Sequence, residues 1–414
     1  MEIKTILNKC HPIRPFVYGE TRFVGTEIQE DIRSRKNSKG VCGKCGRRGS
    51  IYDTSRQPRH FNFIPLWGYA VVLVYAMRRV DCRECGVTTE RVPWAEGKHH
   101  CANVYRIFLS RWAKRLPWTE VAEIFGTTWN VVWRSIQWVV EYGLSHRNMD
   151  GISSIGVDEV CIEKGHKYLT VVYQIDSGLR RLLWVGRERT EETLNAFFDM
   201  LGNARSLKVE FVASDMWKPY LNVIRQRIGH ALHVLDRFHI VAKLNKAVDE
   251  VRAKEAKQLA ADGYEPILKK TRWCFLKRTE NLTERQSEKL DEVLAYDLRS
   301  VRAYLLKESF NGFWRYSSPY WAGWYLDKWC TRAMRSRLDP IKGFVKTLRN
   351  HRELLMNYFK AKKEISSAVV EGLNTNVKLA LRKARGFKSH EVAKTALYHE
   401  LGKLPEPICS HRFC

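Results

Sequence analysis

Two acidic residues occupy unusual places in the chain, one inside and one at the end of a short apolar run. Asp158 interrupts the run of residues 155–160, and Asp215 ends the run of residues 209–215. A carboxylate in apolar surroundings is costly to bury unless it pairs with a cation or is well hydrogen-bonded. Two such carboxylates in one region of the chain therefore indicate a site for a divalent metal ion.

The residues between the two carboxylates have the pattern of a sheet that would hold them. Residues 168–175 and 181–185 are rich in β-branched and aromatic residues, and turn-forming residues separate these runs. Residues 191–201 have a helical pattern, and residues 230–235 indicate a fifth strand. Three hairpin-linked strands, a helix and further strands predict a mixed sheet with both carboxylates at its edge.

Three more residues could serve the same site. Glu371 lies in a stretch that indicates a helix, in which Asn374 and Lys378 would share its face. A carboxylate followed at helical spacing by an amide and a lysine suits a metal ion flanked by phosphates, although Glu371 alone would be interpreted as a surface charge. Asp236 can cap the helix that follows it, and His239 is either a core histidine or a support for the metal site.

Four cysteines form two matching pairs near the start of the chain. Cys42 and Cys45 form one Cys-x-x-Cys-Gly motif, and Cys82 and Cys85 form a second one. Each motif bends so that both thiolates face one ion, and four thiolates complete a structural Zn²⁺ site. The residues between the pairs, including residues 66–79, are strand-like and are expected to form the hairpin of a zinc ribbon.

Other interpretations of these cysteines are weaker. Four unrelated buried cysteines would not repeat the same motif, and a redox Cys-x-x-Cys lacks the strand–helix context that it requires. His99 and His100 could be extra ligands, but a solvated pair before the next helix explains them equally simply.

The next stretch indicates three helices. Residues 103–115 have a helical apolar pattern, Thr119 is placed to cap a second helix, and a glycine ends that helix. Thr127 or Thr128 would cap a third helix over residues 129–142. This succession matches a DNA-binding helix-turn-helix, and the alternative is a plain three-helix connector. The residues that would approach the DNA groove are Trp129, Asn130 and Arg134.

The charge of the chain favours a polyanionic partner. Lys and Arg number 71 against 45 Asp and Glu, a formal charge of +26, and 44% of the residues are hydrophobic. Nucleic acid is the expected partner because phosphate neutralisation drives such binding. We see no apolar run of the roughly 18 residues that a membrane span requires and no signal-peptide pattern. We therefore expect a cytoplasmic protein that spans no membrane and whose 11 cysteines are reduced or metal-bound.

Taken together, these motifs resemble those of bacterial insertion-sequence transposases of the ISL-three family, which belong to the DDE group with an RNase H-like core. The resemblance covers nearly the whole chain. Its motifs are the paired cysteine motifs, residues 112–137, Ile155 to Glu159, Ser214 to Tyr220, Asp236 to His239 and Val370 to Asn374. The resemblance implies that Asp158, Asp215 and Glu371 form the catalytic triad. It also implies that Asp236 and His239 form the Asp-x-x-His element of related transposases with a helical insertion.

The activity that the resemblance implies is DNA strand cleavage and strand transfer. Two Mg²⁺ (or Mn²⁺) ions, roughly 4 Å apart, can activate the attacking oxygen and stabilise the leaving oxygen. Such hard cations take oxygen ligands. Asp158 would bridge both ions, with Asp215 and Glu371 holding one each. Glu159 is the rival ligand, but strand alternation places it on the opposite face from Asp158.

The resemblance also implies the partners, which are double-stranded DNA at the terminal inverted repeats and the target DNA. Pairing two DNA ends implies a homodimer or a higher oligomer. Two alternatives are a transposase-derived DNA-binding regulator without catalysis and an RNase H-like nuclease that cleaves without joining. The basic residues that would follow the DNA backbone are Lys378, Arg382, Lys383 and Arg385.

The expected fold class is α+β and multidomain. The expected segments are an N-terminal arm (1–40), the zinc ribbon (41–100), the helix-turn-helix domain (101–147), the first part of the RNase H-like mixed-sheet core (148–240), a large helical insertion (241–365), the C-terminal helix of the core (366–402) and a tail (403–414). The insertion contains an aromatic cluster between Phe310 and Trp329 that indicates either a helical core or a surface on which bases stack.

Overall fold

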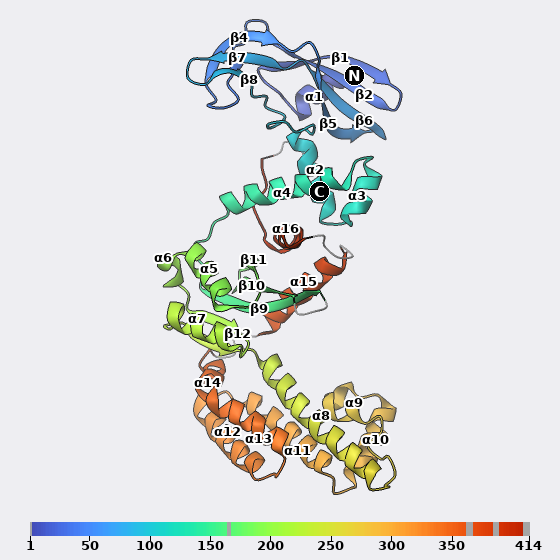
Figure 1. Ribbon diagram of the computed structural model, residues 1–414, viewed down its shortest axis with the longest axis vertical. Helices are drawn as coiled ribbons and strands as arrows, with labels where there is room; N and C mark the ends of the chain where they lie inside the picture. Colours follow the sequence, from blue (N-terminus) through green and yellow to red (C-terminus); the bar gives the residue numbers. More distant parts are fainter. Residues whose placement is uncertain (1, 164–166, 362–366, 384–388, 409–414) are drawn as a thin grey trace. The chain divides into compact units, whose positions relative to one another are not determined.

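The computed structural model describes residues 2–163, 167–361, 367–383 and 389–408 (Figure 1). The chain forms two compact units, one made of Met1–Asn148 with Leu379–Cys414 and the other of Met149–Lys378. Among the described residues, no helix has both the length and the apolar character that a membrane span requires.

A four-stranded sheet opens the first unit. Its order is β1-β2-β6-β5, with bounds Phe16–Val24, Glu27–Ser34, Tyr69–Tyr75 and Arg59–Leu66. Because α1 (Ile3–Cys10), β1 and β2 are folded parts of this unit, the expectation that residues 1–40 form an arm is wrong. Phe16, Ile28 and Ile32 are buried at alternating positions of β1 and β2, and this period of two is the strand signal that the arm interpretation overlooked.

A second sheet of the first unit carries the paired cysteines. Its order is β3-β4-β7-β8, with bounds Gly40–Val41, Arg48–Thr54, Arg78–Cys82 and Gly86–Thr89. The expectation that residues 66–79 form the ribbon's hairpin is wrong, because β6 lies between β2 and β5 in the other sheet. Residues 71–75 are all buried, and a continuous apolar run needs cover on both faces. In the ribbon, β4 pairs with β7 instead.

Three helices follow in the first unit, namely α2 (Asn103–Ala113), α3 (Trp118–Ile124) and α4 (Trp129–His146). The expected cap of α4 is confirmed, since the Thr128 hydroxyl accepts from the backbone N–H of Val131 at 3.4 Å. The expected cap of α3 is wrong, because Thr119 lies inside that helix and Pro117 precedes it.

The C-terminal part of the chain packs onto these helices. We expected residues up to 402 to belong to the catalytic core, but α16 (His390–Leu401) lies in the first unit and contacts α4. The Ser110 hydroxyl lies 2.9 Å from Nε2 of His399, and Glu406 accepts from Arg111 and Lys114 at 2.9 Å each. Within the expected tail, Glu406 is thus held by residues at the C-terminal end of α2.

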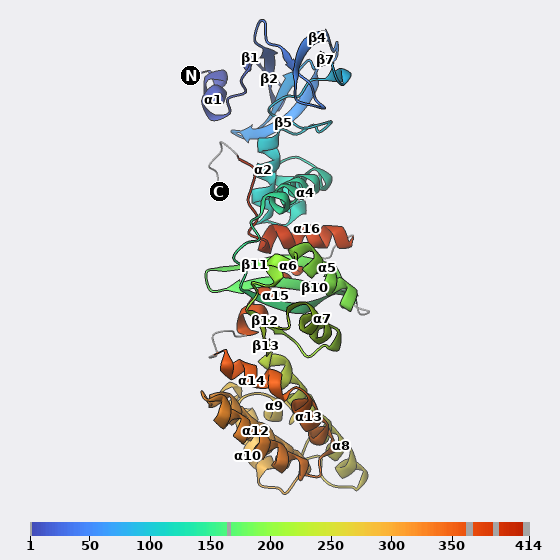
Figure 2. The ribbon, with the colours of Figure 1, turned by 90° about the vertical axis from the view of Figure 1, so that its left-hand side faces the viewer.

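The second unit is built on a five-stranded mixed sheet of order β11-β10-β9-β12-β13 (Figure 2). The bounds are Leu179–Arg187, Lys167–Asp176, Ser154–Glu163, Phe211–Ser214 and Leu232–Leu235. Strands β9, β10 and β11 are antiparallel neighbours, whereas β12 and β13 run parallel to β9. This is the RNase H-like arrangement that the resemblance implied. One face packs against α5 (Glu191–Leu201) and α7 (Lys218–Ile228), and α15 (Ser367–Lys383) packs on the other face. The short α6 (Asn203–Ser206) lies between α5 and β12.

The described residues of the second unit from 237 to 361 are mainly helical, as expected for this part of residues 241–365. Residues 362–366 lie outside the described part of the chain. The helices are α8 (Arg237–Ala261), α9 (Arg272–Leu276), α10 (Glu284–Leu294), α11 (Arg299–Asn311), α12 (Pro319–Met334), α13 (Asp339–Asn350) and α14 (Arg352–Lys360), with 3₁₀ turns η1 (Thr279–Asn281) and η2 (Gly312–Arg315). Their apolar sides share one core with Phe275, Phe310 and Phe313 at its centre. Helix α8 begins directly after β13, so the insertion is attached to the edge strand of the sheet.

Candidate active site and zinc centre

Strand register brings Asp158 and Asp215 to the same place. In the parallel pair of β9 and β12, Ser214 lies opposite Val157, so Asp215 follows at the level of Asp158 where β12 ends. Asp236 follows the neighbouring strand β13 in the same way. Backbone N–H groups hold all three carboxylates, with donor–acceptor distances of 2.7 Å at Asp158, 2.9 Å at Asp215 and 2.7 Å at Asp236. The ends of adjacent parallel strands thus gather three oriented carboxylates.

Burial makes the charged forms of Asp158 and Asp215 expensive. Burial raises the pKa of Asp158 to about 6, despite the backbone N–H of Glu159 and nearby His239, which lower it; Asp215 raises it further. Burial also raises the pKa of Asp215 above its ordinary value. His239 lies on the first turn of α8, with Nε2 at 3.8 Å from Oδ2 of Asp236. Asp215 is near enough to Asp158 to raise its pKa, and a divalent cation, which takes hard oxygen donors, would offset the charge of both carboxylates.

Helix α15 approaches Asp158 from the other face of the sheet. Gly156 and Asp158 share this face, and a Cβ on Gly156 would lie 2.6 Å from Cγ2 of Val370, so only glycine admits the helix this closely. The hydroxyl of Tyr173 donates to Oδ1 of Asn374 at 2.7 Å, and Nδ2 of Asn374 donates to Oδ2 of Asp158. Asn374 is buried, and its amide ties α15 to two strands. The sequence pattern grouped Asn374 with Glu371 but did not identify this role, and it gave no sign of Tyr173.

The structure locates Glu371 through its helix. Glu371 occupies the position of α15 one turn before Asn374, and its side chain lies outside the described part of the structure. The side chains of Arg382 and Lys383, in the last turn of α15, also lie outside it, and Arg385 is outside the described residues altogether. Lys378 is exposed on α15.

An arginine that sequence reasoning missed lies beside the carboxylates. Arg189 donates to both oxygens of Glu159 at 2.8 and 3.0 Å, and its guanidinium lies over the rings of Tyr168 at 4.3 Å and Trp217 at 4.4 Å. Trp217 Nε1 donates to the backbone oxygen of Arg189 at 3.0 Å, and the backbone N–H of Trp217 donates to Asp215. This cluster links the end of β11 to the loop that orients Asp215. Glu159 was the alternative metal ligand, but both of its oxygens accept hydrogen bonds from Arg189.

We expect Trp217→Phe to slow, about five- to tenfold, the DNA strand cleavage and joining that the sequence resemblance implies. Phenylalanine keeps a ring beneath Arg189 but removes the Nε1 donor, and one lost hydrogen bond is worth about 1 to 1.4 kcal/mol, which is about a five- to tenfold change in rate. The matched control is Trp184→Phe. Trp184 packs against the same core as Trp217, but the hydrogen bonds to Asp215 and Arg189 come from Trp217. Equal reaction rates for both variants on a denaturing gel would show that the Trp217 link does not orient Asp215.

The four predicted cysteines come together in the first unit. The sulfur atoms of Cys42, Cys45, Cys82 and Cys85 all lie within 4.8 Å of one another, and those of Cys45 and Cys82 are 3.5 Å apart. A tetrahedral Zn–S bond of about 2.3 Å requires sulfur atoms about 3.8 Å apart, so the arrangement fits zinc.

Electrostatics at the four sulfur atoms agree with a bound cation. A hydrogen bond with the Thr88 hydroxyl at 3.2 Å lowers the pKa of Cys42 to about 6, and backbone N–H groups of Cys45 and Lys44 act in the same direction. The neighbouring sulfur of Cys45 raises the pKa of Cys85 to about 12. Four thiols this close cannot all lose their protons unless a positive ion lies between the sulfur atoms. The cluster therefore matches a closed structural zinc site.

The three residues that were expected to approach a DNA groove have different exposures. Asn130 and Arg134 are exposed one turn apart on α4. Trp129 is half-buried, with ring centroids 5.9 Å from Trp118 and 6.2 Å from Trp133. Asn130 and Arg134 are therefore the better placed of the three to contact a base edge.

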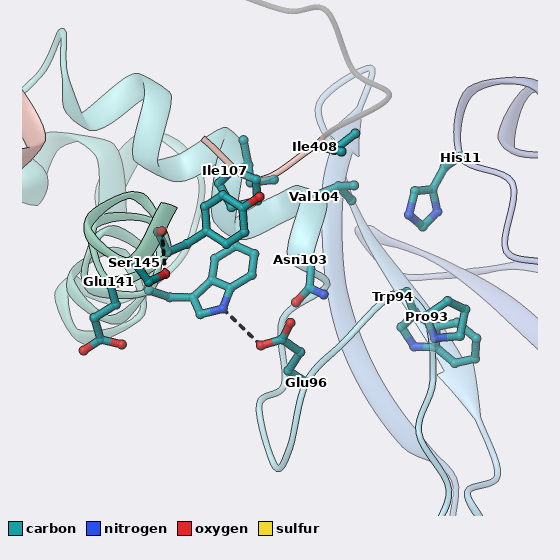
Figure 3. A pocket seen from close by; sticks show the side chains of 13 residues that line it. His11, Pro93, Trp94, Glu96, Asn103, Val104, Ile107, Glu141, Ser145 and Ile408 are labelled. Carbon is teal, nitrogen blue, oxygen red and sulfur yellow. Dashed lines mark hydrogen bonds between the residues drawn. The ribbon is translucent and has the colours of Figure 1, made fainter. Parts of the chain in front are cut away.

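The first unit also contains a cavity of about 510 Å³ that none of the predicted site residues line. Figure 3 shows Trp94, Asn103 and Glu96 at this cavity, with Nε1 of Trp138 donating to Glu96 at 3.1 Å.

Known proteins identify the family of the chain. A family model described as a transposase, of the DDE type and the ISL3 group, matches residues 155–397. Another, described as the zinc-finger of transposase IS204/IS1001/IS1096/IS1165, matches residues 38–85 and thus all four cysteines.

Relatives that are similar over most of their length indicate the same family. The chain is 29% identical over 355 residues to the transposase for insertion sequence element IS1001 of Bordetella parapertussis, covering 85% of this chain and 86% of the relative. It is 30% identical over 393 residues to the transposase for insertion sequence element IS1557 of Mycobacterium tuberculosis, covering 88% and 86%. The chain therefore belongs to the ISL3 family of DDE insertion-sequence transposases.

Proposed function

We propose that Asp158, Asp215 and Glu371 form the catalytic centre with which this transposase cleaves and joins DNA at the ends of an insertion sequence. One observation carries the proposal. The register of β9 and β12 brings Asp158 and Asp215 together, and Asn374 ties α15 to Asp158 one turn after Glu371. Positions three apart on a helix lie on the same face, which supports Glu371 as the third member of the proposed group.

Each residue of the proposed centre has a distinct role. Asp158, Asp215 and Glu371 would hold Mg²⁺ or Mn²⁺, which supplies charge stabilisation at the phosphate and activation of the attacking oxygen. Backbone N–H groups orient the first two carboxylates, and Arg189 with Trp217 fixes the loop after β12. Asp236 and His239, whose side chains approach to 3.8 Å, would support the site beside Asp215 without completing the triad.

DNA binding would involve other parts of the chain. The zinc ribbon and the helix-turn-helix, with Asn130 and Arg134 exposed, suit duplex recognition at the terminal inverted repeats. The formal charge of +26 suits the phosphate backbone of both element and target DNA. Lys378, Arg382, Lys383 and Arg385 would follow that backbone beside the site. Because two ends are paired, we propose a dimer or higher oligomer on DNA, acting in the cytoplasm where the chromosome lies.

A strand-transfer assay tests the proposal. Purified protein is incubated with Mg²⁺, labelled DNA that carries the ends of its own element, and a supercoiled target plasmid. We expect labelled ends joined covalently to the target, with no product in EDTA. Cleaved ends without joined product would indicate a nuclease instead, and specific end binding without any strand breakage would indicate a DNA-binding regulator.

A further inference from the structure

The aromatic cluster of the helical insertion divides into a buried part and an exposed part. Phe310, Phe313, Trp314 and Trp329 are buried in the core of the insertion. The rings at the start of α12 are not: Tyr320 is 73% exposed, Trp321 52% and Trp324 44%. Exposing large rings to water has a cost, so three adjacent ones on a single helix mark a surface that binds something.

The exposed rings form one stripe with cations along α12. Trp321, Trp324, Lys328, Arg332 and Arg335 recur at intervals of three or four residues, so they lie on one face of the helix. Adjacent rings contact edge to face, with centroids 5.2 Å apart for Tyr320–Trp321 and 6.0 Å for Trp321–Trp324. The Lys328 ammonium lies 3.8 Å from the centroid of the Trp324 ring.

The charge beside the rings is positive. Lys328, Arg332 and Arg335 line a groove of about 710 Å³ together with Trp324 and Thr331. Asp327 also lines it, but Arg352 neutralises this carboxylate with hydrogen bonds of 3.0 and 2.8 Å. A partner that fits must therefore present flat π surfaces and negative charge at short intervals. Single-stranded DNA offers both, because its unpaired bases stack on aromatic rings while its phosphates meet cations. In duplex DNA the base faces are hidden in the stack.

We propose that this stripe on α12 binds unpaired nucleotides of the DNA on which the transposase acts. The inference rests on the proposed function and adds to it the strand state that the insertion recognises. Tyr320, Trp321 and Trp324 supply the stacking surfaces. Lys328 is exposed, and its flexible side chain can exchange the Trp324 ring for a phosphate.

The test compares single-stranded with duplex affinity in matched variants. The probes are fluorescein-labelled oligo-dT of about 16 nucleotides and a duplex of the same length, followed by anisotropy at about 0.2 M salt, where phosphate-only binding is weak. We expect Trp321→Ala with Trp324→Ala to weaken oligo-dT binding about tenfold to a hundredfold and duplex binding less than about twofold. Phenylalanine at both positions should restore most of the affinity. Lys328→Ala should reduce the steepness of the plot of log affinity against log salt concentration by about one unit, because one phosphate contact is lost.

The matched control is Trp273→Ala. Trp273 is 53% exposed in the same helical insertion and also lies beside an arginine, with Arg272 5.4 Å from its ring centroid, but it stands apart from the α12 stripe. Unchanged oligo-dT binding in this variant supports the inference. An equal loss in both variants, or an equal loss of duplex and oligo-dT affinity in the α12 variant, would overturn it. So would a change of oligomeric state by light scattering, since the stripe would then contact a second copy of the chain.

The strand-transfer assay on the same preparations separates this inference from the proposed function. A wild-type protein that joins element ends but binds oligo-dT no better than the α12 alanine variant contradicts the inference alone. A protein whose oligo-dT binding depends on Trp321 and Trp324, but which joins no ends, supports the inference and contradicts the proposed function.

Discussion

Asp158→Asn is expected to lower the rate of strand transfer by about 10³-fold or more, while the affinity for element-end DNA stays within roughly twofold. Asparagine keeps the size of the side chain, and its single oxygen can accept from either Asn374 or the backbone N–H of Glu159, but it cannot offset the charge of a divalent ion. The loss of several kcal/mol of charge stabilisation at the phosphate then appears entirely in the chemical step. Strand transfer and a gel shift are measured on the same preparation.

Stability measurements separate loss of chemistry from loss of fold. Asp158 is 7% exposed, and a buried charge without a counter-ion costs free energy, so the variant should be at least as stable as the native protein in metal-free buffer. The native protein should gain thermal stability when Mn²⁺ is added, and the variant should gain less. A variant that melts earlier in EDTA would mean that the carboxylate holds the sheet together.

Companion variants define the boundaries of the site. Asp215→Asn and Glu371→Gln should lose strand transfer to a similar degree, whereas Asp199→Asn, an exposed carboxylate on α5 paired with Arg227, should not. Glu159→Gln should have an intermediate effect, because it weakens the hold on Arg189 without removing a triad carboxylate. Strand transfer that survives Glu371→Gln would remove Glu371 from the proposed centre, whatever the result at Asp158.

The sequence predicted the sheet well because its signals are local. Strands β9, β10 and β11 follow from apolar runs separated by turn residues, and α5 agrees with its predicted bounds. The cap formed by Asp236 was also predictable, since an acidic residue before a helical pattern commonly accepts from the second backbone N–H. Once β9 and β12 are parallel neighbours, their register alone brings Asp158 beside Asp215.

The features that the sequence did not predict depend on contacts between distant segments. Tyr173 and Asn374 are 201 positions apart, and Ser110 and His399 are 289 positions apart. Neither pair leaves a periodic signal, so the role of Asn374 and the packing of α16 in the first unit were not foreseeable. Arg189 was missed for a related reason. It follows a strand as an ordinary basic residue, and only the fold places Glu159, Tyr168 and Trp217 around it.

The zinc ribbon is expected to unfold when its metal is removed. The sheet that carries the cysteines has little core of its own. Strand β3 has two residues, and no residue of β4 is fully buried. Val80 is its buried centre, so most of the cohesion must come from the ion. Structural zinc sites of this kind supply about 10 kcal/mol or more of apparent binding free energy at pH 7, which is also folding free energy. We expect one zinc per chain by elemental analysis.

Cys82→Ser should therefore abolish zinc binding and weaken the binding of element-end duplex at least about tenfold, since the folded ribbon is part of the proposed DNA-binding surface. The matched control is Cys10→Ser, an exposed cysteine of the same unit that lies outside the four-sulfur cluster. The cores of the mixed sheet and of the helical insertion contain no residue of the zinc ribbon. The thermal transition of these parts should therefore persist in Cys82→Ser. A variant that loses zinc but binds element ends with native affinity would assign end recognition to the helix-turn-helix alone. Full zinc content in Cys82→Ser would contradict the four-cysteine site itself.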